Sequence, residues 1–136
     1  MNVTELFLQR YNALYDFWLG GVWEMVPDDL MRQRPHPQVN SIAWILWHLT
    51  RVEDAGLNRF VVDGSQVLYD GSWMEKMDLP IRHSGGDMNF AEVDDLSQRI
   101  NLQALQEYSK AVQLRTREIV SQLTYDSLDS VMEEAY

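Results

Sequence analysis

The strongest constraint on the fold is segment 40–54, which reads Asn-Ser-Ile-Ala-Trp-Ile-Leu-Trp-His-Leu-Thr-Arg-Val-Glu-Asp. The Asn and Ser at its start are residue types that cap helices, and Pro37 just upstream opposes an earlier helix start. Almost every side chain in 42–49 is apolar, and a helix that is apolar on all sides is normally buried. The sequence therefore predicts a central buried helix, which we expect to extend from about Ser41 to Val62.

A helical wheel at about 100° per residue divides this helix into two faces. We expect the apolar face to lie in the core and the polar face, together with Glu53, to lie in solvent. The apolar face comprises Ile42, Ile45, Leu46, Leu49, Val52 and Gly56, and the polar face comprises Arg51, Asp54 and Asn58. His48 falls on the border between them, so two interpretations stay open. It either reaches into a cleft or is a half-buried side chain bonded to a backbone carbonyl or a carboxylate.

The rest of the chain also has helical periodicity. We expect helices over residues 4–25, with a kink or end at Gly20 and Gly21, and over residues 27–31, 89–99 and 102–123. Residues 63–88 form a long connection without clear periodicity, which is typical of a functional or ordered covering loop. A further helix begins at Asp126 and is cut short at Tyr136.

This pattern predicts an all-α bundle that forms one domain over residues 1–136. Three long amphipathic helices and an incomplete fourth would leave an apolar groove on one side. A fourth helix or a partner subunit would have to cover that groove. Lys110, Arg115 and Arg117 are interpreted as part of the solvated face of their helix.

Composition excludes several classes of function. The net charge of −10 opposes binding to nucleic acid or to an anionic membrane. The chain has no cysteine, so it can form neither a disulfide nor a thiolate metal site, which fits a cytoplasmic protein. No apolar run approaches the roughly 18 residues of a membrane span, and the first residues do not resemble a signal peptide.

The chemical motifs are sparse. No phosphate-binding loop, dinucleotide fingerprint or nucleophile elbow is present. His48 is the leading candidate metal ligand, but the positions one turn away on its helix hold no second ligand, so other elements would have to supply the rest. His36 and His83 are weaker candidates in loops. Trp44, Trp47 and Trp73 either line a pocket or belong to the core.

Segment 40–54 resembles the second helix of the DinB-like superfamily, which includes proteins related to mycothiol-dependent maleylpyruvate isomerase and the bacillithiol transferases. Segments 34–37, 73–80 and 85–88 are also similar to an uncharacterised subgroup of this superfamily. The resemblance covers nearly the whole chain.

The resemblance implies an up-down-down-up four-helix bundle with a long crossover between helices 2 and 3, and with the fourth helix incomplete in this chain. It also implies a divalent metal, most often zinc or nickel, with His48 as one ligand, and a low-molecular-weight thiol as a further cofactor. In this family the other ligands are His or Glu one turn apart on the fourth helix, which places them beyond Tyr136. Glu133 and Glu134 lie too near the start of that helix to be assigned.

Two functions follow from these observations. The first is a metal-dependent thiol transferase or isomerase that acts on a small organic substrate. The alternative is a non-catalytic bundle that works through homodimerisation or small-ligand binding and keeps His48 as a relic of the metal site. The sequence leaves open whether the protein is an enzyme.

Overall fold

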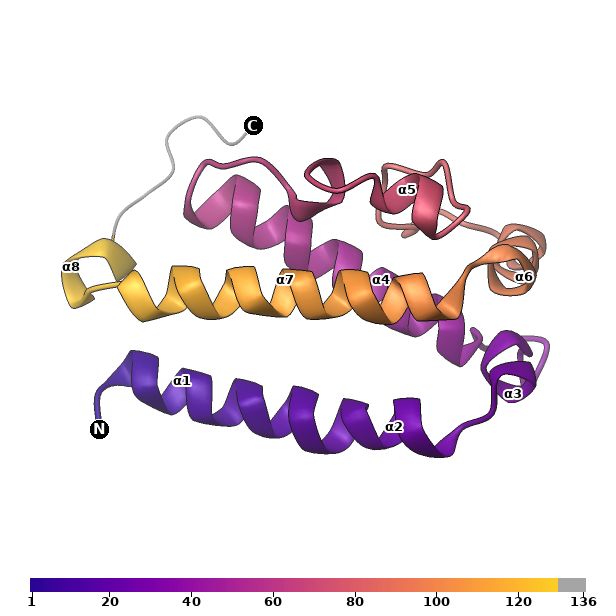
Figure 1. Ribbon diagram of the computed structural model, residues 1–136, viewed down its shortest axis with the longest axis horizontal. Coiled ribbons are helices and arrows are strands. Elements are labelled where there is room, and N and C mark those ends of the chain that lie inside the picture. Colours follow the sequence, from indigo (N-terminus) through magenta and orange to yellow (C-terminus); the bar gives the residue numbers. More distant parts are fainter. Residues whose placement is uncertain (130–136) are drawn as a thin grey trace.

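A computed structural model describes residues 1–129, and every regular element in that range is helical (Figure 1). The elements are α1 (Val3–Asn12), the π-helical η1 (Ala13–Leu19), α2 (Gly20–Met25), α3 (Asp28–Arg32), α4 (Ile42–Gly56), the π-helical η2 (Leu57–Val61), the 3₁₀ turn η3 (Val67–Tyr69), α5 (Trp73–Lys76), α6 (Phe90–Arg99), α7 (Leu102–Gln122) and α8 (Tyr125–Leu128). The all-α prediction is confirmed.

The long helices form three rods. Elements α1, η1 and α2 join into one rod without a break at the two glycines, α4 with η2 runs back in the opposite direction, and α7 runs roughly parallel to α4 (Figure 1). α7 packs against both α1 and α4. This up-down-down order agrees with the predicted bundle. The expected continuation of the fourth helix through Val131 and Met132 lies outside the described residues.

Side-chain caps start the helices close to where the sequence predicted. The Ser41 hydroxyl accepts from the Trp44 N–H at 3.0 Å and starts α4. Asn89 and Glu92 form the expected reciprocal capping box of α6. The first helix differs by a little, because Asn2 rather than Thr4 caps it.

The predicted faces of the central helix are wrong for its polar residues and for part of its apolar residues. Asp54 is 0% exposed and Arg51 is 1% exposed, although both were placed in solvent. Val52, which was placed in the core, is 49% exposed, and Ile45 is exposed as well. The reason is that the crossover between η2 and α6 lies over the polar face and supplies hydrogen-bond partners that a helical wheel does not include.

The Asp54 carboxylate is the centre of this buried polar face. It accepts the backbone N–H groups of Val67 and Leu68 at 2.8 and 2.9 Å, which fixes the start of the crossover. It also accepts the Tyr108 hydroxyl of α7 at 2.6 Å and the side-chain amide of Asn58 at 3.0 Å. A single carboxylate therefore joins α4, α7 and the crossover. Burial and the adjacent Asp54 charge raise the pKa of Tyr108, which keeps its hydroxyl protonated.

Arg51 holds the other end of the crossover. Its guanidinium donates to the Arg82 carbonyl at 2.6 Å and to the Gln66 side chain at 2.9 Å. It also donates to the Tyr108 hydroxyl at 2.9 Å, and its contact with Asp54 is 3.4 Å long. The two buried charges compensate each other and hold residues that are distant in the sequence.

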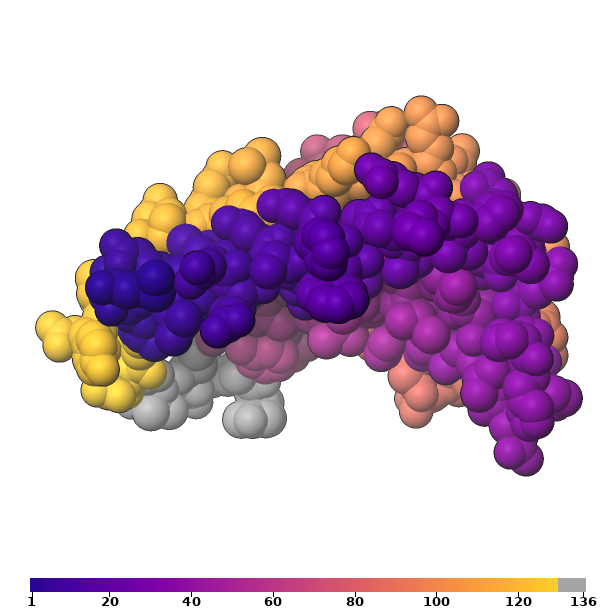
Figure 2. Space-filling view, turned by 90° about the horizontal axis from the view of Figure 1, so that it is seen from below, coloured from indigo at the N-terminus to yellow at the C-terminus, as the bar shows by residue number. Residues whose placement is uncertain are grey.

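The opposite side of α4 is left open. Apolar side chains of Ile45, Leu49 and Val52 are exposed there, and Leu14 and Trp18 of η1 are exposed on the neighbouring rod, with Trp18 67% accessible. Figure 2 shows this side, where α4 and η2 lie set back alongside α1 and α2. These exposed apolar side chains of α4 and η1 are called the apolar groove below, and the groove itself, expected from the incomplete fourth helix, stays a prediction.

Within residues 1–129, no helix has the length and apolar character that a membrane crossing requires. The assignment of residues 1–136 to one domain stays a prediction.

Replacing Arg51 by Met should destabilise the protein by about 3–5 kcal/mol, because it leaves the buried Asp54 charge without its cation. Urea denaturation followed by circular dichroism measures this loss. Arg99→Met is the matched control, since Arg99 pairs with Asp78 at the surface and its removal should change the midpoint little. Equal midpoints for the two variants would contradict the role assigned to Arg51.

Candidate functional site around His48

His48 is half-buried on α4, and two contacts fix its ring. The imidazole stacks on Trp44 with the ring centroids 4.5 Å apart and the planes at 13°. Its Nδ1 is hydrogen-bonded to the carbonyl oxygen of Ser84 in the crossover. Because a carbonyl only accepts, the contact requires the proton on Nδ1, so in the neutral ring the lone pair is on Nε2.

The turn that carries Ser84 depends on Gly85. Gly85 has φ +88°, a conformation that L side chains rarely adopt, and its N–H donates to Nδ1 of His83 at 3.0 Å. A Cβ at this position would lie 2.5 Å from the Trp47 ring. The indole N–H of Trp44 contacts the Met88 sulfur at 3.3 Å, just after the turn. The second half of the crossover is thus packed directly on the aromatic face beside His48.

The protonation pattern of His48 suits a metal ligand, because metal-binding histidines commonly donate their second N–H to a carbonyl. Within residues 1–129, no group of three His, Cys, Asp or Glu side chains is close enough to hold an ion. The described part of the chain therefore does not by itself fit the triad that the family resemblance implies. Glu133 and Glu134 lie outside the described residues.

The two loop histidines serve local structure. His36 is exposed, and its Nδ1 accepts from the Gln38 N–H at 3.1 Å. His83 is also exposed, and its Nδ1 accepts the hydrogen bond from the Gly85 N–H. Neither is in a group that could hold a metal with other side chains of residues 1–129.

The three tryptophans named as possible pocket residues belong to the packing of the core. Trp44 and Trp47 are members of the buried cluster, and Trp73 packs on it from the crossover, with its ring 5.7 Å from that of Tyr108. The core interpretation of these residues is therefore the one that the geometry favours.

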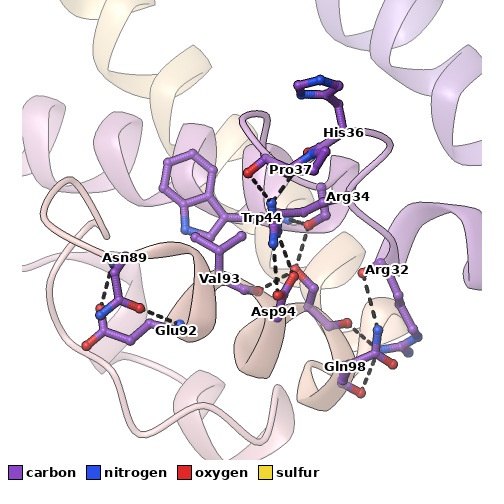
Figure 3. Close-up of polar contacts among 12 residues, drawn as sticks. Arg32, Arg34, His36, Pro37, Trp44, Asn89, Glu92, Val93, Asp94 and Gln98 are labelled. Atoms are coloured by element: carbon purple, nitrogen blue, oxygen red, sulfur yellow. Dashed lines mark hydrogen bonds and ion pairs between the residues drawn. The ribbon is translucent and has the colours of Figure 1, made fainter.

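The loop that leads into α4 is held by arginines (Figure 3). Arg34 forms a two-pronged ion pair with Asp94, at 2.7 and 3.1 Å, and donates to the Pro37 carbonyl at 2.7 Å. This pairing lowers the pKa of Asp94. Arg32 donates to the Ile100 carbonyl at 2.8 Å and so helps satisfy the C-terminal end of α6. These contacts fix where α4 begins and hence where His48 lies.

A second polar cluster lies where the three rods meet. The half-buried Glu53 carboxylate accepts the hydroxyls of Tyr11 at 2.7 Å, Tyr15 at 2.6 Å and Thr116 at 2.9 Å. The helical wheel places Glu53 in solvent, so the sequence does not predict this cluster. The one available signal was the pair of tyrosines four residues apart on the first helix, which were assigned to the apolar stripe.

Burial and the hydrogen bonds to Glu53 raise the pKa values of both Tyr11 and Tyr15 above the ordinary value of 10.0. The two hydroxyls therefore stay protonated and keep donating well above neutral pH. Three charge-assisted hydrogen bonds to Glu53 therefore join the rod that contains α4 to the first rod and to α7.

The comparisons with known proteins agree with this fold. A family model described as the DinB superfamily matches residues 19–135. A solved structure of a conserved protein from Enterococcus faecalis is similar over 100% of this chain and 79% of its own, with a TM-score of 0.77 and 19% identity. At that identity the likeness concerns the fold alone. No curated protein sequence gives a significant match.

Gly85→Ala should destabilise the protein by about 2 kcal/mol or more, because the new methyl group enters Trp47 and the residue keeps a strained φ. Gly86→Ala is the matched control, because a Cβ there has no heavy atom within 4 Å. Thermal unfolding of both variants tests this. A Gly85→Ala protein as stable as Gly86→Ala would contradict the described turn.

Stability should fall as the pH rises above about 10, because the unfolded tyrosines ionise there while Tyr11 and Tyr15 in the folded protein do not. The stabilisation that the two tyrosines provide is complete below the pKa that they have in the unfolded chain. It is lost as the pH rises through their raised pKa in the folded protein. Tyr15→Phe should lower stability at pH 7 by about 1 kcal/mol and flatten the alkaline slope. Denaturation midpoints between pH 7 and 11 measure both effects, with the exposed Tyr125→Phe as the control.

Proposed function

The chain belongs to the DinB superfamily, and from this we propose that it is a metal-binding DinB-like protein in which His48 provides one ligand to a divalent ion. The observation that carries the proposal is the oriented imidazole. Its Nδ1 is engaged by the Ser84 carbonyl, and Trp44 fixes the plane of the ring. Such outer contacts hold a ligand in one tautomer and one direction.

A three-ligand site would need at least one ligand from outside residues 1–129, since the described residues contain no group of three His, Cys, Asp or Glu side chains that could hold an ion. When bound, a zinc or nickel ion with open positions would lower the pKa of a coordinated thiol or water and supply a nucleophile at neutral pH. The part of this chain would be to orient His48 and to cover one side of it with the aromatic crossover. The activity proposed on this basis is a thiol transferase or isomerase reaction on a small organic molecule.

The second candidate is a non-catalytic bundle that acts by homodimerisation. The observation that favours it is the exposure of the apolar side chains Trp18, Ile45 and Val52 on η1 and α4. Apolar patches of this kind commonly mark interaction sites. In that case His48 is a packed remnant whose bond to Ser84 is purely structural.

Metal binding separates the two candidates. The metal-binding proposal predicts that zinc or nickel at about 100 times Kd stabilises the protein by about 2.7 kcal/mol, and that His48→Ala removes this effect. Calorimetric titration and thermal unfolding with and without the ion measure it, together with elemental analysis. His36→Ala, which alters an exposed loop histidine, should bind as the parent does. Unchanged binding by the His48 variant, or no metal in any of the proteins, would favour the remnant interpretation.

Dimerisation through the groove predicts a dimer in sedimentation velocity that Trp18→Glu dissociates by placing a charge in the interface. Leu114→Glu is the control, because Leu114 is also exposed but lies on α7 outside the groove. A monomer at all concentrations, or a dimer insensitive to Trp18→Glu, would rule out association through this face.

A further inference from the structure

A cleft of about 430 Å³ lies between α2 and α7, with α4 as its floor. Its floor residues are Leu46, Leu49 and Thr50, of which Leu46 and Thr50 lie on the side of α4 away from His48 on the helical wheel. The volume is within the range of small-molecule sites, which is roughly 300–1,000 Å³. The cleft is separate from the proposed metal ligand and calls for its own explanation.

Small residues create this space in the bundle. The cleft is lined by Gly20 of α2, Thr50 of α4 and Ser109 of α7. A helical bundle usually places large aliphatic side chains at such core positions. Thr50 and Ser109 are buried, so they are core positions by location. A Cβ at Gly20 would have the Tyr15 carbonyl at 3.3 Å as its near contact. The chain therefore leaves one layer of its core incompletely filled.

The walls of the cleft differ in chemistry. Trp23, Leu46 and Leu49 provide an apolar surface on the α2 and α4 sides. On the α7 side, Gln113 donates its amide N–H to the Ser109 hydroxyl oxygen at 2.9 Å. This contact leaves the Ser109 hydroxyl hydrogen and the Gln113 amide oxygen as a donor and an acceptor beside the apolar surface.

The charges at the rim cancel. Asp16 and Glu24 line the cleft with Lys110 and Arg117, and Arg117 is already paired with Asp16 at 3.2 Å. The cleft therefore has no net charge that would favour an anion or a cation, even though the whole chain carries −10. A charged ligand would lose hydration without gaining an unmatched partner.

We propose that this cleft binds a small neutral amphipathic molecule. A ring or branched apolar body packs against Trp23, Leu46 and Leu49, and a hydroxyl or amide group bonds to Ser109 and Gln113. The inference does not depend on a metal at His48, because His48 does not line the cleft.

Three probes with the same ring and different charges test this: benzyl alcohol, benzoate and benzylammonium. Ligand-observed and protein-observed NMR titrations of the full chain should show one saturable site for benzyl alcohol, with Kd of roughly 1 mM or tighter. The two charged probes should bind at least ten times more weakly. Absence of saturable benzyl alcohol binding, or equal binding of the three probes, would overturn the proposal.

Ser109→Leu should fill the cleft and weaken benzyl alcohol binding at least tenfold while keeping the protein folded. Ser121→Leu makes the same change on the same helix at an exposed position and should leave binding unchanged. Gln113→Met keeps the side-chain shape, removes the amide and should also weaken binding, so it decides the question if Ser109→Leu fails to fold. Binding that survives both cleft variants would show that the probe binds elsewhere.

Discussion

The buried carboxylate of Asp54 is the contact on which the rest of the structure depends. It accepts hydrogen bonds from two backbone N–H groups of the crossover, from Tyr108 on α7 and from Asn58 on its own rod. Arg51, one turn earlier, compensates its charge and holds the far end of the crossover through the Arg82 carbonyl. Because an unpaired charge in this position would be very costly, the pair holds the long connection between η2 and α6 at Val67, Leu68 and Arg82.

That path determines the surroundings of His48. Once the crossover is fixed at Gln66 and Arg82, the following turn at Gly85 brings the Ser84 carbonyl onto the imidazole. The crossover also covers the polar face of α4, so the apolar side chains Ile45 and Val52 are left on the open face. One buried ion pair thus underlies both the oriented histidine and the uncovered groove, which are the features behind the two candidate functions.

The two polar clusters, around Asp54 and around Glu53, hold different parts of the three-rod bundle together. Asp54 joins α4 to α7 and the crossover, and Glu53, the next residue along the chain, joins α4 to the first rod through Tyr11 and Tyr15. Adjacent carboxylates on one helix therefore point to different partners. Toward the other end of the first rod, residues 1–129 form no comparable cluster between α2 and α7, and the cleft lined by Gly20 and Ser109 lies between them.

The sequence by itself determined the helices, their caps and the superfamily, because these depend on local periodicity and on residues a few positions apart, such as Asn89 and Glu92. It also identified His48 as the residue of interest and anticipated its bond to a carbonyl as one alternative. Only the tertiary structure decided which face of α4 is buried. A helical wheel assigns burial from polarity, but Arg51 and Asp54 are buried because Tyr108, Gln66 and the Arg82 carbonyl, all distant in the sequence, satisfy their charges and hydrogen bonds.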